Sequence, residues 1–108
     1  GIRRLANQAL VDVFSSLGGK GWRLKNGWLT PGTDVKRWHG ITVDSGKLVS
    51  LNLISNNLQG DIPRTISNLV TLRALNMSYN FGVVGALPVE VGSMANLTVL
   101  HVYSSGIH

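Results

Sequence analysis

A glycine-rich turn that contains a lysine is the first group of residues whose types suggest chemistry. Gly18-Gly19-Lys20-Gly21 resembles a phosphate loop only in part, because Lys20 is followed by Gly instead of Ser or Thr and the leading glycine is missing at its required distance. His39, His101 and His108 lack the pairwise spacing and nearby carboxylates of a metal site. The five carboxylates are dispersed and suggest no acid–base pair. We therefore expect no catalytic residue, no metal and no cofactor.

The absence of cysteine excludes several further kinds of functional site. Without cysteine the chain has no disulfide, no thiolate zinc site, no iron–sulfur cluster and no cysteine nucleophile. Its 108 residues are enough for one small domain, and 44% hydrophobic with 14% charged residues is too apolar for a disordered chain. The longest stretch without charged and polar side chains, residues 81–89, is far too short to span a bilayer. We expect one folded domain with no transmembrane segment.

The charge of the chain is concentrated in its first half. Eight of the ten Lys and Arg residues, but only three of the five acidic residues, precede residue 48, and the net charge is +5. The bases are scattered and no basic run alternates with aromatic residues, so a nucleic acid is not the expected partner. They form either an ordinary solvated surface or a docking surface for an acidic partner, and the candidates for docking are Arg3, Arg4, Arg23, Lys36 and Arg37.

An internal repeat organises the second half. The segments that begin at Leu48, Leu72 and Leu97 share their apolar columns and are spaced 24 and 25 residues apart, with the extra residue between Asn80 and Gly85. Within each segment the apolar residues alternate with period two, which is typical of a short strand with one face inward. We therefore predict parallel strands at about 50–54, 74–78 and 99–103.

The residues that follow each predicted strand also recur. Asn56 and Asn80 lie where the chain must turn, and a stacked Asn side chain can bond the backbone of its own and neighbouring turns. Ser105 takes this place in the third repeat and can do so only in part. Two Ile/Leu-Pro pairs and apolar residues three apart then predict a short helix that packs inward in each complete repeat.

These segments resemble the leucine-rich repeat family, and more narrowly its plant-type class, whose repeat reads LxxLxLxxNxLxGxIPxxLxxLxx. Residues 48–71 fit this pattern almost letter for letter. Residues 22–47 resemble the cap that precedes such repeats, with Val43 in the place of the family's usual cysteine. The resemblance implies an α/β fold, namely a right-handed solenoid with short parallel strands and a helical, Trp-rich N-terminal cap. It also implies an extracellular or membrane-associated location.

The first 47 residues are predicted to close one end of this array. Leu5, Ala9, Leu10, Val13, Phe14 and Leu17 recur at helical spacing and describe one apolar face, and a Gly-Gly pair ends the helix. Trp22, Trp28 and Trp38 either form a ligand platform or, as we favour, cover the open end of the core. Residues 41–43 and 48–49 predict a hairpin that leads into the first repeat. We divide the chain into a cap, residues 1–47, and repeats at 48–71, 72–96 and 97–108, the last incomplete.

The side chains that point away from the core are the candidate binding residues. They form columns on the concave face of the predicted sheet: Ser50, Asn52, Ile54, Ala74, Asn76, Ser78, Val99, His101 and Tyr103. By resemblance, a protein or peptide binds there, as at the N-terminal end of a larger recognition protein. The alternative is a structural subunit that docks through its basic cap and its open C-terminal end, which further repeats or another chain would cover.

Two N-glycosylation sequons are also present. They are Asn76-Met77-Ser78 and Asn96-Leu97-Thr98. Both also arise from the repeat pattern itself, so the sequence alone leaves their occupancy open.

Overall fold

The computed structural model describes residues 2–103 and 105–107, with the backbone alone at residues 2, 3 and 107. A long helix comes first, and all later elements are short strands or single 3-10 turns. The helices are α1 (Ile2–Ser16), η1 (Gly19–Gly21), η2 (Val35–Arg37), η3 (Arg64–Asn68) and η4 (Val89–Ser93). The strands are β1 (Ile41–Asp44), β2 (Lys47–Asn52), β3 (Gln59–Gly60), β4 (Ala74–Asn76), β5 (Gly82–Gly85), β6 (Val99–His101) and β7 (Gly106–Ile107).

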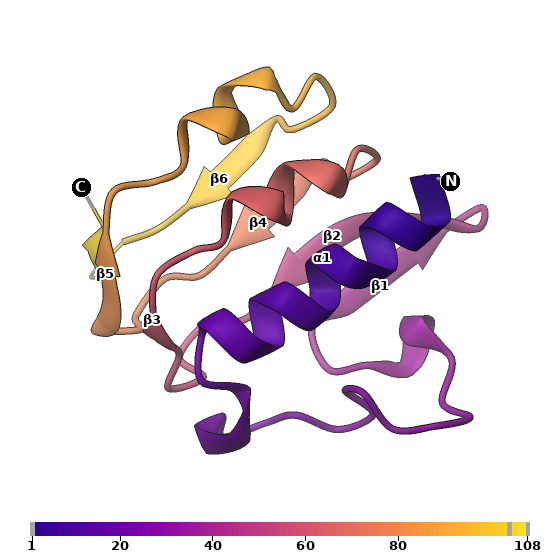
Figure 1. Ribbon diagram of the computed structural model, residues 1–108, viewed down its shortest axis with the longest axis horizontal. Helices are drawn as coiled ribbons and strands as arrows, with labels where there is room; N and C mark the ends of the chain where they lie inside the picture. The colour runs from indigo at the N-terminus through magenta and orange to yellow at the C-terminus, as the bar shows by residue number, and fades with distance from the viewer. Residues whose placement is uncertain (1, 104, 108) are drawn as a thin grey trace.

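The main sheet has the order β1-β2-β4-β6 (Figure 1). β2, β4 and β6 are parallel neighbours, as the spacing of 24 and 25 residues predicts, and Asn52, Asn76 and His101 are register partners. β4 and β6 each end two residues earlier than predicted, and β2 covers residues 47–52 where 50–54 was predicted. Backbone bonds from Leu53 N to Asn76 O and from Ser55 N to Ser78 O nevertheless continue the pairing into the turn.

A hairpin closes one edge of this sheet. β1 pairs with β2 in the antiparallel direction, which confirms the hairpin predicted from residues 41–49. Its two turn residues, Ser45 at φ 53° and Gly46 at φ 76°, both have positive φ, as a tight hairpin turn with the native twist requires. Among the described residues, β1 and β6 are the two edge strands of this sheet.

A second, smaller ladder runs beside the main sheet. β3, β5 and β7 pair in parallel, where each coil turns away from the main sheet. β5 has four residues and β3 only two, so the extra residue of the second repeat lies at this ladder. The pairing of Asn76 with His101 in the main sheet is therefore undisturbed.

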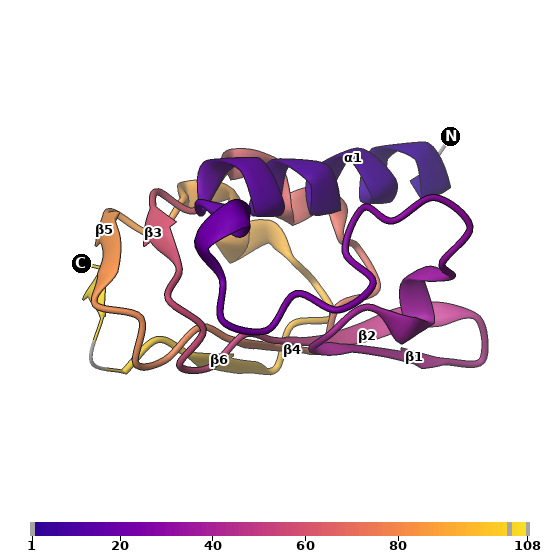
Figure 2. The same cartoon turned by 90° about the horizontal axis from the view of Figure 1, so that it is seen from below.

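The layer opposite the main sheet is helical. Figure 2 shows α1, η3 and η4 on one side and the sheet on the other. Pro63 and Pro88 each stand as the N-terminal cap of their 3-10 helix, where a missing N–H is harmless. Ile66 and Leu69, and likewise Val91 and Met94, are buried, which confirms the predicted inward-packing turns.

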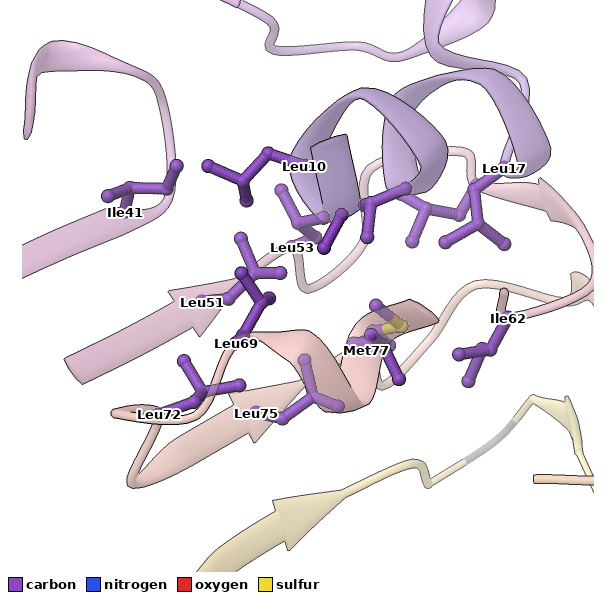
Figure 3. Close-up of a cluster of buried hydrophobic side chains, with 14 of the residues drawn as sticks. Leu10, Leu17, Ile41, Leu51, Leu53, Ile62, Leu69, Leu72, Leu75 and Met77 are labelled. Carbon is purple, nitrogen blue, oxygen red and sulfur yellow. The ribbon is translucent and has the colours of Figure 1, made fainter. Parts of the chain in front are cut away.

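The core lies between these two layers. Figure 3 shows side chains from α1, the sheet and η3 pointing toward one another. Residues less than 2% exposed come from the helix and from the coils that follow it, and the largest are Leu10, Val13, Leu17, Leu51, Leu53, Leu58, Ile66, Leu69, Leu72, Leu75, Met77 and Val83. One core prediction is wrong, because Leu5 is 52% exposed.

Aromatic side chains pack under the first coil. Phe14 of α1 lies 5.1 Å from Trp22, Trp22 lies 4.9 Å from Trp28, and Trp28 lies 5.0 Å from Trp38, between ring centroids. Each indole also donates to a backbone carbonyl: Trp22 to Leu17, Trp28 to His39 and Trp38 to Thr33. Trp22 and Trp28 are buried, so these rings serve packing and offer little surface to a ligand.

Buried asparagines tie successive coils together. The amide nitrogen of Asn80 donates to Leu53 O, Met77 O and Ser78 O, and its Oδ1 accepts from the N–H groups of Asn56 and Leu58. Asn56 bonds the preceding segment in the same way, since its side chain both accepts from Leu24 N and donates to Leu24 O.

In the third coil Ser105 takes the place of asparagine. Its Oγ donates to Val102 O, the counterpart of the bond from Asn80 to Met77 O.

Candidate functional site

The candidate site is the sheet face turned away from α1, η3 and η4, here called the open sheet face (Figure 2). Side chains alternate along a strand, so the residues between the buried leucines must point to this side. The register places them in rows across the three parallel strands. One row consists of Ser50, Ala74 and Val99, and the next consists of Asn52, Asn76 and His101.

A third row begins where the strands end. Ile54 and Tyr103 are 43% and 62% exposed, which makes them the large apolar surfaces at this end of the open sheet face. The ring of His101 lies 5.3 Å from that of Tyr103 at an interplanar angle of 31°. The imidazole and the phenol thus form one continuous aromatic surface beside the amides of Asn52 and Asn76.

Ser78, the middle member of this third row, is not available to a ligand. It is only 1% exposed, although the sequence predicts a surface position. Its Oγ accepts a hydrogen bond of 3.0 Å from Tyr103 N, so the backbone of the third coil covers it.

Ser78 is buried because each strand ends with a backbone N–H that has no backbone acceptor and needs a side-chain acceptor instead. The N–H of Ile54 is bound by Asn52 Oδ1 at 3.2 Å, and the N–H of Ser78 is bound by Asn76 Oδ1 at 3.0 Å. In the third coil His101 stands where the other coils have Asn, and Ser78 of the neighbouring coil supplies the acceptor instead. Sequence reasoning missed this role because it depends on the register between coils.

The basic residues lie elsewhere, in the N-terminal region. Arg4, Arg23, Lys36 and Arg37 are exposed and come from three separate segments, and the side chain of Arg3 lies outside the described residues. Arg23 is held in place, because its Nη1 donates to Ser55 O at 2.9 Å. Lys36 and Arg37 lie on η2, whose N-terminal cap is the side chain of Asp34.

A groove near η2 is a feature that the sequence does not predict. It has a volume of about 750 Å³ and lies between α1, η2 and the β1–β2 hairpin. Its walls are mostly apolar, with two lysines and one carboxylate: Ala6, Leu10, Asp34, Val35, Lys36, Val43, Lys47, Leu48 and Val70 take part. Only the fold brings these distant segments together, so no local pattern in the sequence marks them.

The two sequons lie in different surroundings. Asn76 is half-buried in β4, the middle strand of the parallel set, and the serine of its sequon is buried. Asn96 is exposed beside the helical layer, and its Nδ2 donates to Val70 O at 2.9 Å. A glycan on Asn76 would project from the open sheet face, whereas one on Asn96 would not.

The described residues contain no cluster of three or more His, Asp or Glu side chains that fits a metal ion. None of the helices in the described part of the chain has the length and apolar character that crossing a bilayer requires.

The sequence relatives include plant receptor kinases. No family model matches the chain. Over 88 residues it is 35% identical to a probable inactive receptor kinase of Arabidopsis thaliana, which covers 79% of this chain and 12% of that protein. Over 105 residues it is 30% identical to phytosulfokine receptor 1 of the same plant, which covers 93% of this chain and 10% of that protein. The chain thus spans about an eighth or less of these relatives.

Several solved structures have a fold similar to that of this chain. The BIR2 ectodomain of Arabidopsis thaliana superposes with a TM-score of 0.83 at 19% identity, over 94% of this chain and 56% of that one. A plant ice-binding protein gives 0.83 at 22% identity, over 96% of this chain and 34% of that one. The BIR3–SERK2 complex of Arabidopsis thaliana gives 0.67 at 22% identity, over 97% of this chain and 57% of that one.

The leucine-rich repeat ectodomain of the Arabidopsis thaliana receptor kinase SOBIR1 is also similar in structure. It superposes with a TM-score of 0.71 at 24% identity, over 94% of this chain and 54% of that one. The chain therefore has the fold of leucine-rich repeat ectodomains, and its homologues are plant receptor kinases.

Proposed function

We propose that this chain is a non-catalytic recognition module of the plant-type leucine-rich repeat class, and that it binds a protein or peptide on its open sheet face. In this proposal residues 1–47 cap a right-handed solenoid whose concave side is that face, and residues 48–108 carry the repeats. The observation that carries the proposal is the set of registered rows of polar and aromatic side chains that have no core to pack against.

Tyr103 is the proposed anchor of the partner. A tyrosine offers a large amphipathic contact area and has few rotatable bonds to immobilise, which is why tyrosines are frequent at the energetic centres of interfaces. Tyr103 is the most exposed aromatic on this face among the described residues, and the ring of His101 lies beside it at an interplanar angle of 31°. Among the structural relatives, BIR3 forms a complex with SERK2, which agrees with a protein partner.

A selection experiment tests the proposal even while the natural partner is unidentified. Random peptides are selected against the immobilised chain, and the affinity of a selected peptide is measured by calorimetry. Tyr103→Ala is expected to lower this affinity by about 1 kcal/mol or more. A change below about 0.5 kcal/mol, together with loss of binding in Lys36→Glu and Arg37→Glu, would contradict the assignment to the open sheet face.

The groove beside η2 favours a second candidate function, that of an assembly subunit. Its apolar walls with Lys36 and Lys47 suit the docking of an acidic and apolar protein segment. At the opposite end, the half-buried Leu87, Leu97 and Leu100 line a depression beside the edge strand β6. Docking through the groove, which carries Lys36 and Lys47, predicts an affinity that falls steeply with added salt, whereas binding centred on Tyr103 predicts a weaker salt dependence.

A further inference from the structure

The amides of Asn52 and Asn76 are oriented by the fold. Each Oδ1 is committed to a backbone N–H two residues further on, at 3.2 Å for Asn52 and 3.0 Å for Asn76. This bond fixes which end of the amide is nitrogen, and no described residue offers an acceptor to either Nδ2. Within the described part of the chain, both Nδ2 groups are therefore donors without a partner.

The register places the two donors side by side. Asn52 and Asn76 are partners on adjacent parallel strands, and such strands lie about 4.8 Å apart. His101 continues the row on the next strand. Two N–H donors at this separation can each reach one oxygen of a single carboxylate, with N···O distances of about 2.9 Å. Each amide oxygen already accepts one hydrogen bond while each Nδ2 is free among the described residues, so the pair of amides suits a ligand that offers acceptors.

The charge around the row also favours an anion. The described rows of the open sheet face contain no Asp or Glu between Ser50 and Tyr103. Arg23 is held by Ser55 O in the turn that follows β2, just beyond Asn52. Among the residues of the described strands only Asp44 is acidic, and it pairs in register with Lys47 at the hairpin turn.

We propose that Asn52 and Asn76 together bind a carboxylate of the recognised protein or peptide, with Arg23 supplying long-range attraction. This inference rests on the proposed function, because it names the chemical group that the open sheet face takes. It assigns Tyr103 to the apolar part of the partner and the two asparagines to the anionic part.

Acetate is the probe that tests this inference, and acetamide is its neutral control. The side-chain Nδ2 signals of the ¹⁵N-labelled chain are followed by NMR while acetate replaces chloride at constant ionic strength. We expect saturable shifts at Asn52 and Asn76 with acetate and none with acetamide. Shifts that stay linear, that acetamide reproduces, or that appear only near Lys36 and Arg37 would overturn the proposal.

Isosteric variants separate binding from folding. Asn52→Asp and Asn76→Asp keep an oxygen for the backbone N–H and replace the free donor with an acceptor, and either is expected to weaken acetate binding at least tenfold, as read from the remaining amide. Asn26→Asp is the matched control, since Asn26 is exposed in the N-terminal region and its side chain makes no bond among the described residues. Unchanged acetate affinity in both Asp variants, with wild-type melting curves, would refute the assignment.

The two proposals fail in distinguishable ways. If selected peptides depend on Tyr103 but acetate does not bind the asparagines, the recognition face stands and the carboxylate inference falls. If acetate binds while no selected peptide responds to Tyr103→Ala, the two amides bind a carboxylate, but the proposed function falls and with it the assignment of that carboxylate to a recognised partner.

Discussion

Asparagine does different work in different columns of this chain. Asn80 is buried and bonds five backbone groups in two coils. Its side chain supplies the hydrogen bonds that these buried groups cannot obtain from water. Asn76, four residues earlier, makes one local bond and leaves its nitrogen free among the described residues. The same residue type thus has a structural role in the interior and an exposed donor on the surface, and its position along the coil determines which.

Asn80→Ala is expected to destabilise the fold by about 3 kcal/mol or more, because it leaves several buried backbone groups without partners. Chemical denaturation measures the loss. Arg73→Ala is the control: Arg73 is exposed, and its replacement is expected to cost under about 0.5 kcal/mol. Comparable losses at the two positions would contradict the role assigned to Asn80.

At the scale of elements, the strands, the hairpin and the inward-packing turns follow from the sequence, because the 24- and 25-residue spacing superposes apolar columns that must stack to be buried. Helical spacing places Leu5 in the core because spacing alone treats all apolar positions alike. Leu5 lies about a quarter turn from the centre of the buried face formed by Ala9, Leu10, Val13 and Leu17. Phe14 lies on the other flank, where the tryptophans cover it.

Sequence reasoning predicted the asparagine bonds between coils, but it missed two other contacts between distant segments. The burial of Ser78 depends on a bond from a backbone group 25 residues away, and the groove beside η2 needs three segments placed by tertiary packing. The rows of the open sheet face were predictable as columns, but the orientation of their amides was not, because it follows from unpaired N–H groups at the strand ends.

Two glycines with similar backbone angles provide a test at this scale. Gly40 has φ 84°, and a Cβ there would meet Asn52 O at the end of β2. Gly46 has φ 76° in the hairpin turn and open space around it. Gly46→Ala is expected to cost about 1–2 kcal/mol from the left-handed conformation alone.

Gly40→Ala adds a backbone clash to this strain and is expected to cost clearly more, because strand β2 must shift to admit the methyl group. Thermal or chemical unfolding ranks the two variants. Equal losses would mean that the close approach between Gly40 and β2 does not constrain the sheet.

The whole molecule is expected to unfold as one unit. The helix contacts the first coil, the first coil packs on the second, and the core residues form a single cluster from Ala9 to Met94. No coil can bury its leucines alone, so the N-terminal region and the coils that follow it depend on one another. The three tryptophans lie in the N-terminal region and report on it separately from the repeats.

Leu75→Ala, a change in the second coil, should therefore lower the stability recorded by tryptophan fluorescence by about 2–5 kcal/mol. Far-UV circular dichroism should record the same midpoint. A tryptophan transition that stays at the wild-type midpoint while the dichroism shifts would show that the two regions unfold independently.

The extra residue of the second repeat has a consequence for how such chains change in length. It lies at β5, in the side ladder, while Asn76 and His101 stay in register on the main sheet. A change of one residue in repeat length is thus absorbed at this ladder, and the rows of the open sheet face keep their register.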